Sequence, residues 1–109
     1  MTVPLTQDAL AGEVGKHDGL VLLLTEGGCS VAEAIEPKLE AMLAARFPKL
    51  ERLVVSKDDA PELAAQLGVF VFPAVVAYFG GKESARFVRT FSLDVVADAL
   101  ERPYGIVFG

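Results

Sequence analysis

The sequence predicts an α/β domain in which helices cover both faces of a mixed β-sheet. Three observations lead to this prediction: an apolar run at residues 20–25, an alternation of strand-like and helix-like segments after it, and the pair Gly80-Gly81. A short apolar run is typical of a strand that is buried on both faces. A strand–helix–strand order makes parallel neighbours through a right-handed crossover, whereas a glycine pair is typical of an antiparallel hairpin. Together they predict parallel and antiparallel pairing in one sheet.

The first predicted elements are a helix and a strand. Thr6 is placed to cap a helix in which Leu10 and Val14 lie on one face. Gly12 and Gly15 weaken this helix, because glycine loses more backbone entropy than other residues. The run Leu20–Thr25 is the first strand.

A long helix follows and should begin at Ser30. Ser30 and Glu33 have the spacing of a capping box, in which each side chain binds a free backbone N–H group of the other residue. Pro37 lies inside this helix and should kink it, and Pro48 should end it. Its apolar residues recur at helical spacing: Ile35, Leu39, Met42, Leu43 and Phe47.

The next elements are a strand and a short helix. The strand is Leu53–Val55, and Asp59 is expected to cap the helix that follows. Leu63 and Leu67 should face the core, and Gly68 should end the helix.

The last elements are a hairpin and a helix. The strand 74–79 leads through Gly80-Gly81 into a returning strand, with Ala85 and Phe87 on one face. Ser92 should cap the final helix and Pro103 should end it, leaving the apolar tail 103–109. This tail either docks on the domain or bridges two copies of the chain.

Length and composition limit the classes of function that this chain can have. With 109 residues, of which 52% are hydrophobic, the chain should form a single domain, 1–109, with its core at about 6–102. Its formal net charge is −5, and no stripe of Lys and Arg is present. The sequence therefore predicts no nucleic-acid binding and no attraction to an anionic membrane surface.

Compartment and metal binding can be argued from the same composition. The first residues lack a basic segment followed by an apolar one, and one cysteine cannot form an internal disulfide. Both observations favour a cytoplasmic protein. The lone His17 lies in a polar turn and should be a solvated loop residue, so we expect neither a metal site nor a bound cofactor.

Cys29 is the candidate catalytic residue. It follows Gly27-Gly28 at the junction between the first strand and the long helix. The positive end of a helix dipole favours a thiolate over a thiol, which lowers the pKa of a cysteine from its usual value of about 8.5. An unreactive thiol is the alternative interpretation.

This order of elements, with a thiol at the first strand-to-helix junction, resembles the thioredoxin superfamily. Pro37 follows Cys29 by eight residues, as does the helix-kinking proline of thioredoxins, and Pro73 follows Cys29 by 44 residues, as does their cis-proline. Phe79-Gly80-Gly81 matches their hairpin. The resemblance covers about residues 6–102 and implies a thioredoxin-like fold, with Gly28, Ser30, Phe72 and Pro73 as candidate binding residues around Cys29.

The chain also departs from the pattern of this family. Its motif is Cys29-Ser30-Val31-Ala32, so the position of the second, resolving cysteine holds Ala32. The resemblance implies a buried acid and a lysine that move protons behind the motif, but Leu23 and Val54 stand at those positions. Glu33 stands where many members carry a basic group and should raise the pKa of the thiol. A two-thiol cycle within the chain is therefore excluded.

Two functions remain open from the sequence. In the first, Cys29 forms a mixed disulfide with a protein thiol or glutathione, and an external thiol such as glutathione resolves it. In the second, the domain is redox-inactive and binds a protein partner through the groove beside Phe72-Pro73. The stretch 69–72 would either line that groove or lie buried beneath the sheet edge. The oligomeric state, the substrate and the partner are not determined by the sequence.

Overall fold

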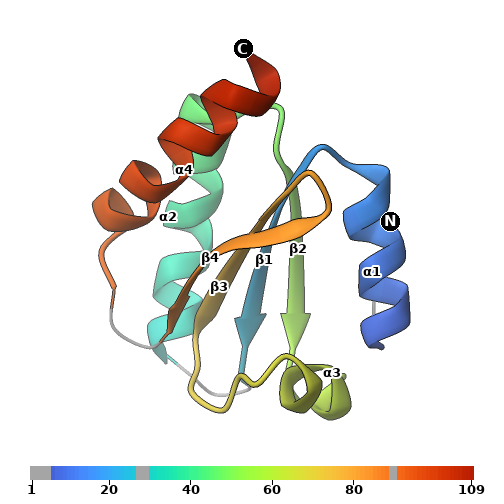
Figure 1. Ribbon diagram of the computed structural model, residues 1–109. Helices are drawn as coiled ribbons and strands as arrows, with labels where there is room; N and C mark the ends of the chain where they lie inside the picture. Colours follow the sequence, from blue (N-terminus) through green and yellow to red (C-terminus); the bar gives the residue numbers. More distant parts are fainter. Residues whose placement is uncertain (1–5, 27–29, 89–90) are drawn as a thin grey trace.

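The computed structural model describes residues 6–26, 30–88 and 91–109, and the side chains of residues 30–33 lie outside this description. Four helices and four strands are present in the described residues, in the predicted order (Figure 1). They are α1 (Gln7–Lys16), β1 (Gly19–Thr25), α2 (Ser30–Arg46), β2 (Glu51–Ser56), α3 (Pro61–Gln66), β3 (Ala74–Phe79), β4 (Lys82–Val88) and α4 (Leu93–Phe108). The predicted α/β class is confirmed. None of the helices in these residues is long and apolar enough to cross a bilayer.

The sheet is mixed, with strand order β2-β1-β3-β4. β1 runs parallel to β2 and antiparallel to β3, and β4 returns antiparallel to β3. Gly80 and Gly81 both have positive φ angles, of 61° and 82°, which are typical of the two-residue hairpin turn that glycine permits. The predicted crossover and hairpin are therefore both present.

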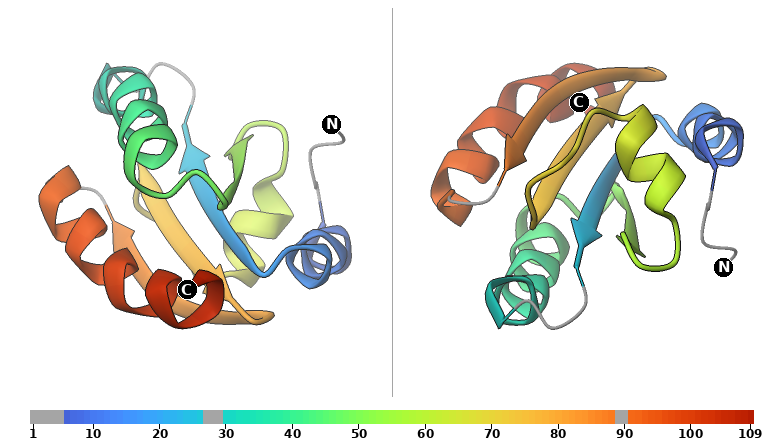
Figure 2. Two further views of the ribbon diagram at one scale, coloured as in Figure 1. Left: turned by 90° about the horizontal axis from the view of Figure 1, so that it is seen from above. Right: turned by 90° about the horizontal axis from the view of Figure 1, so that it is seen from below.

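Helices cover both faces of the sheet, with α1 and α3 on one face and α2 and α4 on the other (Figure 2). Successive side chains of β1 point to opposite faces, so Leu20, Leu22 and Leu24 join one core cluster, whereas Val21 and Leu23 join the other. All five of these side chains are buried. This double burial explains why β1 is apolar throughout.

The start of α3 differs from the prediction. Asp59 does not cap it, because the residue before the helix is Ala60, which makes no capping hydrogen bond with its side chain. Pro61 begins the helix instead, since proline lacks the N–H group that a first helical position leaves unpaired. The predicted end is correct: Gly68 has a φ of 74°, and the N–H groups of Gly68 and Val69 donate to helix carbonyls in a Schellman motif.

The end of α4 also differs from the prediction. Pro103 does not end this helix but lies inside it, and residues 103–108 are its last turns rather than a tail. Tyr104 packs edge-on against Phe47, with ring centroids 5.1 Å apart, and Phe108 packs against Tyr104 at 4.8 Å. These ring contacts stabilise the helical turns that follow Pro103, although proline cannot donate a backbone hydrogen bond to the preceding turn. The C-terminal segment thus docks on its own domain.

Candidate functional site

The strand ends that flank the predicted thiol site meet at one edge of the sheet. β1 ends and β3 begins there, since Leu24 is the register partner of Ala74, and Ala74 is in turn the partner of Val88 in β4. α2 also begins at this edge (Figure 1). We call it the thiol edge, because Cys29 follows β1 and directly precedes the first residue of α2 in the sequence.

The predicted nucleophile itself lies outside the described residues. This holds for Cys29 and for Gly28, one of the candidate binding residues. Ser30 is the first residue of α2, but its side chain and that of Glu33 are also outside, so the predicted capping box is not tested. α2 does begin where the capping pattern predicts, and Pro37 lies inside it.

The other two candidate residues, Phe72 and Pro73, are buried where the chain enters β3. The peptide bond between them is cis. Lys57, which follows β2, places its ammonium group 5.7 Å from the centre of the Phe72 ring. A cation over an aromatic face is attracted by the electrons of the ring.

Lys57 connects three segments of this edge. Its backbone N–H donates to the carbonyl of Thr25 at 2.7 Å, and its ammonium group pairs with Glu26 at 3.5 Å. Its third contact is the Phe72 ring described above. The sequence analysis missed this residue, and no motif around Lys57 would have indicated it. It is the cationic side chain, among those described, that joins the end of β1 to the segment before Pro73.

A small cleft lies beside Phe72. Its volume is about 200 Å³, and it is lined by α3, Lys57 and three residues of the segment 69–72, namely Val69, Phe70 and Phe72. Within that segment Val69 and Phe72 are buried, whereas Phe70 is 76% exposed and Val71 is 40% exposed. Of the segment 69–72, Val69, Phe70 and Phe72 line the cleft, and two of these three, Val69 and Phe72, are buried. Exposed apolar side chains beside a cleft are a feature of surfaces that contact other molecules.

The interior behind the thiol edge is apolar. Leu23 in β1 and Val54 in β2 are direct register partners, so the two positions where the resemblance implies an acid and a lysine do lie side by side. Leu23 is buried and Val54 packs against the same core cluster. This pair of side chains can neither accept nor donate a proton.

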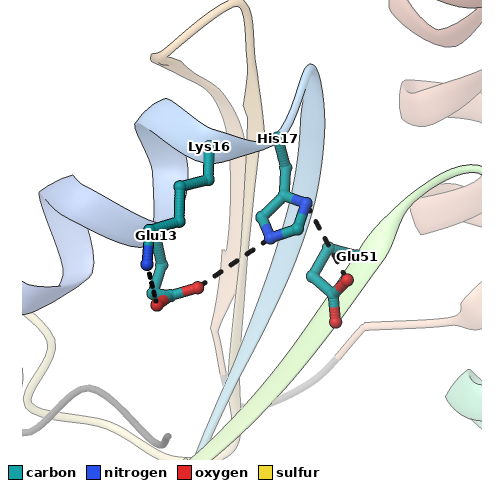
Figure 3. A network of polar contacts seen from close by, with 4 residues as sticks. All are labelled: Glu13, Lys16, His17 and Glu51. Atoms are coloured by element: carbon teal, nitrogen blue, oxygen red, sulfur yellow. Dashed lines mark hydrogen bonds and ion pairs between the residues drawn. The ribbon is translucent and has the colours of Figure 1, made fainter. Parts of the chain in front are cut away.

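His17 lies in the loop after α1, as predicted, but it is not simply solvated. Its two ring nitrogens each lie 3.8 Å from a carboxylate oxygen, one on Glu13 of α1 and the other on Glu51 of β2 (Figure 3). Lys16 pairs with the same Glu13 at 3.2 Å. His17 thus connects the end of α1 to the start of β2. Among the residues that the structure describes, no cluster of three or more His, Cys, Asp or Glu side chains is arranged to hold a metal ion.

No family model matches this chain. Solved structures do match it. Mitochondrial thioredoxin 3 from Saccharomyces cerevisiae superposes with a TM-score of 0.81 at 16% identity, covering 93% of this chain and 94% of the thioredoxin. Thioredoxin from Fasciola hepatica gives 0.79 at 25% identity, covering 93% and 98%.

A third match extends this result to a bacterial protein. Thioredoxin 1 from Thermosipho africanus gives a TM-score of 0.73 at 27% identity, covering 83% of this chain and 99% of that protein. The three matches share the sheet and its flanking helices with this chain over most of their length. By its fold, this chain is a member of the thioredoxin superfamily.

Proposed function

We propose that this chain is a monothiol thiol–disulfide protein of the cytoplasm, with Cys29 as its nucleophile. The observation that carries the proposal is the position of the lone cysteine. In the sequence it directly precedes the first residue of α2, and that helix begins at the edge where β1 ends and Phe72-Pro73 leads into β3. A helix N-terminus stabilises a thiolate through the dipole of its peptide groups.

The reaction has two balanced exchange steps. The Cys29 thiolate attacks one sulfur of a disulfide in a partner, forming a mixed disulfide and releasing the other sulfur as a thiolate. The thiolate of glutathione then attacks the partner's sulfur in that mixed disulfide, which releases Cys29 as a thiolate and leaves the partner joined to glutathione. Neither step needs a second cysteine in this chain.

The residues behind the thiol restrict how it loses its proton. Because Leu23 and Val54 are apolar, neither side chain can take the proton of Cys29, and we expect that proton to pass to water. We then expect the helix dipole to lower the thiol pKa and the negative charge of Glu33 to raise it. We therefore expect a pKa that is lowered only modestly from that of a free cysteine.

Alkylation of the single thiol tests this proposal. The rate of reaction with iodoacetamide, followed against pH by mass spectrometry, reports the fraction of thiolate at Cys29. We expect an inflection below the free-cysteine value of about 8.5. An inflection at or above that value would contradict the nucleophilic role.

The second candidate is a redox-inactive module that binds a protein partner. Phe70 and Val71 favour it, because both are exposed beside the cleft at Phe72 and neither takes part in thiol chemistry. Such a module would use the same thiol edge for recognition and would need no sulfur.

Two variants separate the candidates. If the thiol is the functional group, Cys29→Ser should abolish both the glutathionylation of this chain and its reduction of a partner disulfide. Phe70→Ser should leave both reactions intact. For a binding module the pattern reverses: a partner captured by the wild type is retained by Cys29→Ser and lost by Phe70→Ser. Phe70 is exposed, so its replacement should not disturb the core.

A further inference from the structure

A second cleft lies between α1 and the β3–β4 hairpin. Its volume is about 210 Å³, and we call it the Tyr78 cleft. Aliphatic side chains form most of its wall, with the exposed Gln7 at the rim. The other residues that line it include Leu10, Ala11, Val14, Leu67 and Tyr78. This volume is below the range of about 300–1,000 Å³ typical of pockets for drug-sized ligands, so the cleft suits only a compact molecule, and its wall is largely apolar.

Tyr78 lines this cleft and carries a buried hydroxyl group. The residue is 8% exposed, and its hydroxyl oxygen has no hydrogen-bond partner among the described residues. A buried polar group without a partner is costly and uncommon in native proteins. Either a water molecule or a bound ligand can supply the missing partner.

The charged residues nearest to Tyr78 do not supply that partner. Glu83 is its register partner on β4, but both carboxylate oxygens of Glu83 accept hydrogen bonds from Arg86, at 2.7 and 2.9 Å. Arg86 also donates from Nη1 to the carbonyl of Leu67 at 2.8 Å. These groups satisfy one another, which leaves the hydroxyl of Tyr78 as an unused donor.

That hydroxyl keeps its proton at neutral pH. Burial raises the pKa of Tyr78 above its ordinary value of 10.0, and the negative charge of Glu83 raises it further, while Arg86 opposes the shift. The group can therefore donate a hydrogen bond across the whole physiological range.

We propose that the Tyr78 cleft binds a small, uncharged, largely apolar molecule through one hydrogen-bond acceptor, to which the Tyr78 hydroxyl donates. An apolar body matches the aliphatic walls. A charged ligand would lose its hydration without gaining a partner, because Glu83 and Arg86 are already paired. The ligand class is thus a compact ketone, ether or ester rather than an acid or an amine.

Access to the hydroxyl requires a small movement at the rim. The side chain of Gln7 is exposed and that of Leu67 is half-buried, so both can shift without opening the core. The cleft also lies at the hairpin end of β3, since Gly81 lines it, whereas Pro73 precedes the other end. This site is therefore separate from the thiol edge and does not depend on the reactivity of Cys29.

A titration with two ligands of matched shape tests the proposal on the full chain. Acetophenone carries a carbonyl acceptor, and ethylbenzene has a similar size without one. Amide chemical shifts in ¹H–¹⁵N spectra report both the affinity and the place of binding. We expect the residues of α1 and the hairpin to shift, with acetophenone binding about 3- to 10-fold more tightly, the ratio that one net hydrogen bond provides.

Two variants complete the test. Tyr78→Phe keeps the ring and removes the donor, so both ligands should bind it with equal affinity. Ala11→Leu fills the cleft from an exposed position on α1 and should abolish binding of both, while leucine keeps a high helix propensity. Far-ultraviolet circular dichroism confirms that each variant is folded.

The proposal is overturned by any of three results. Equal affinity of the wild type for the two ligands would show that the hydroxyl is not used. A preference for acetophenone that persists in Tyr78→Phe would place the acceptor elsewhere. The absence of shifts along α1 and the hairpin with either ligand would show that the cleft takes only water.

Discussion

At the scale of single residues, the two tyrosines of this chain have opposite hydrogen-bond states. The buried hydroxyl of Tyr78 has no hydrogen-bond partner in the part of the chain that the structure describes, whereas the hydroxyl of Tyr104 accepts a bond from the backbone N–H of Lys49 at 3.2 Å. The same change from tyrosine to phenylalanine should therefore have different effects at the two positions.

We expect Tyr104→Phe to lower the free energy of unfolding by about 0.5–1.5 kcal/mol, because the N–H of Lys49 loses its partner. Tyr78→Phe should leave it unchanged or raise it, because the lost hydroxyl made no bond to the protein. Urea denaturation of both variants measures the difference. A larger loss for Tyr78→Phe than for Tyr104→Phe would mean that the Tyr78 hydroxyl is satisfied in solution.

Glu83 provides a pH-dependent test at the same scale. Hydrogen bonds from Arg86 hold the pKa of Glu83 below its ordinary value of 4.5. Because the folded-state pKa is the lower one, the resulting stabilisation is present above the unfolded-state pKa, and it is lost as the pH falls through the folded-state pKa. The side chains are more than a third exposed, so the effect should be small.

We expect Glu83→Gln to be less stable than the wild type at neutral pH, and the two proteins to converge as the pH falls below about 4. Thermal unfolding midpoints across this range measure the convergence. Asp98→Asn, an exposed change on α4, is the control for the loss of one negative charge. A stability gap that stays constant with pH would contradict the assigned ion pair.

At the scale of elements, adjacent strands β1 and β2 hold an apolar pair where the resemblance implies an acid and a lysine. Leu23 is 1% exposed, so Leu23→Asp buries an unpaired charge and should cost about 3–5 kcal/mol. Val54→Lys should cost less, because a long lysine side chain at a half-buried position can carry its charge to the surface.

The double variant tests whether these two positions interact as their register implies. Since Leu23 and Val54 are direct register partners, the new ammonium can reach the new carboxylate. The double variant should therefore lose less free energy of unfolding than the two single variants lose together, by at least about 1 kcal/mol. Chemical denaturation of all four proteins completes the cycle. Effects that add within about 0.5 kcal/mol would show that the two side chains do not meet.

Element boundaries also show where sequence patterns mislead. Local signals predicted the caps at Thr6 and Ser92, because the side chain of each binds a nearby N–H group, at Ala9 and Val95. The prediction that Pro103 ends its helix is wrong because contacts with residues far away in the sequence hold the last turns of α4 in place. Gly19 leaves space for Phe108, since a Cβ at Gly19 would lie 2.9 Å from that ring.

At the scale of the whole molecule, the fold could be predicted from the sequence to a larger extent than the site. Periodicity and glycine pairs report burial and turns, so strands such as Ala74–Phe79 were placed with their observed bounds. The contact of Lys57 with the Phe72 ring and the isolation of the Tyr78 hydroxyl arise only when separate elements pack together. No local pattern encodes such contacts.

At the same scale, the chain can be tested as a redox unit. The variant Ala32→Cys places a second thiol three residues after Cys29, which is the spacing of the two cysteines in thioredoxin-like motifs. We expect this variant to form an internal disulfide, detected as a loss of two hydrogens by mass spectrometry, and to reduce insulin with dithiothreitol as electron donor, which the wild type does poorly.

Ala34→Cys is the matched control for this gain. It adds a second thiol to the same helix at an exposed position, but at a spacing that turns it away from the start of α2. Its insulin reduction should therefore stay at the wild-type rate. Tyr78→Phe introduced into Ala32→Cys should not change the gained activity either, because the Tyr78 cleft lies at the opposite end of β3. Equal rates for Ala32→Cys and Ala34→Cys would mean that the start of α2 does not organise thiol exchange, and the monothiol proposal for Cys29 would then lose its structural basis.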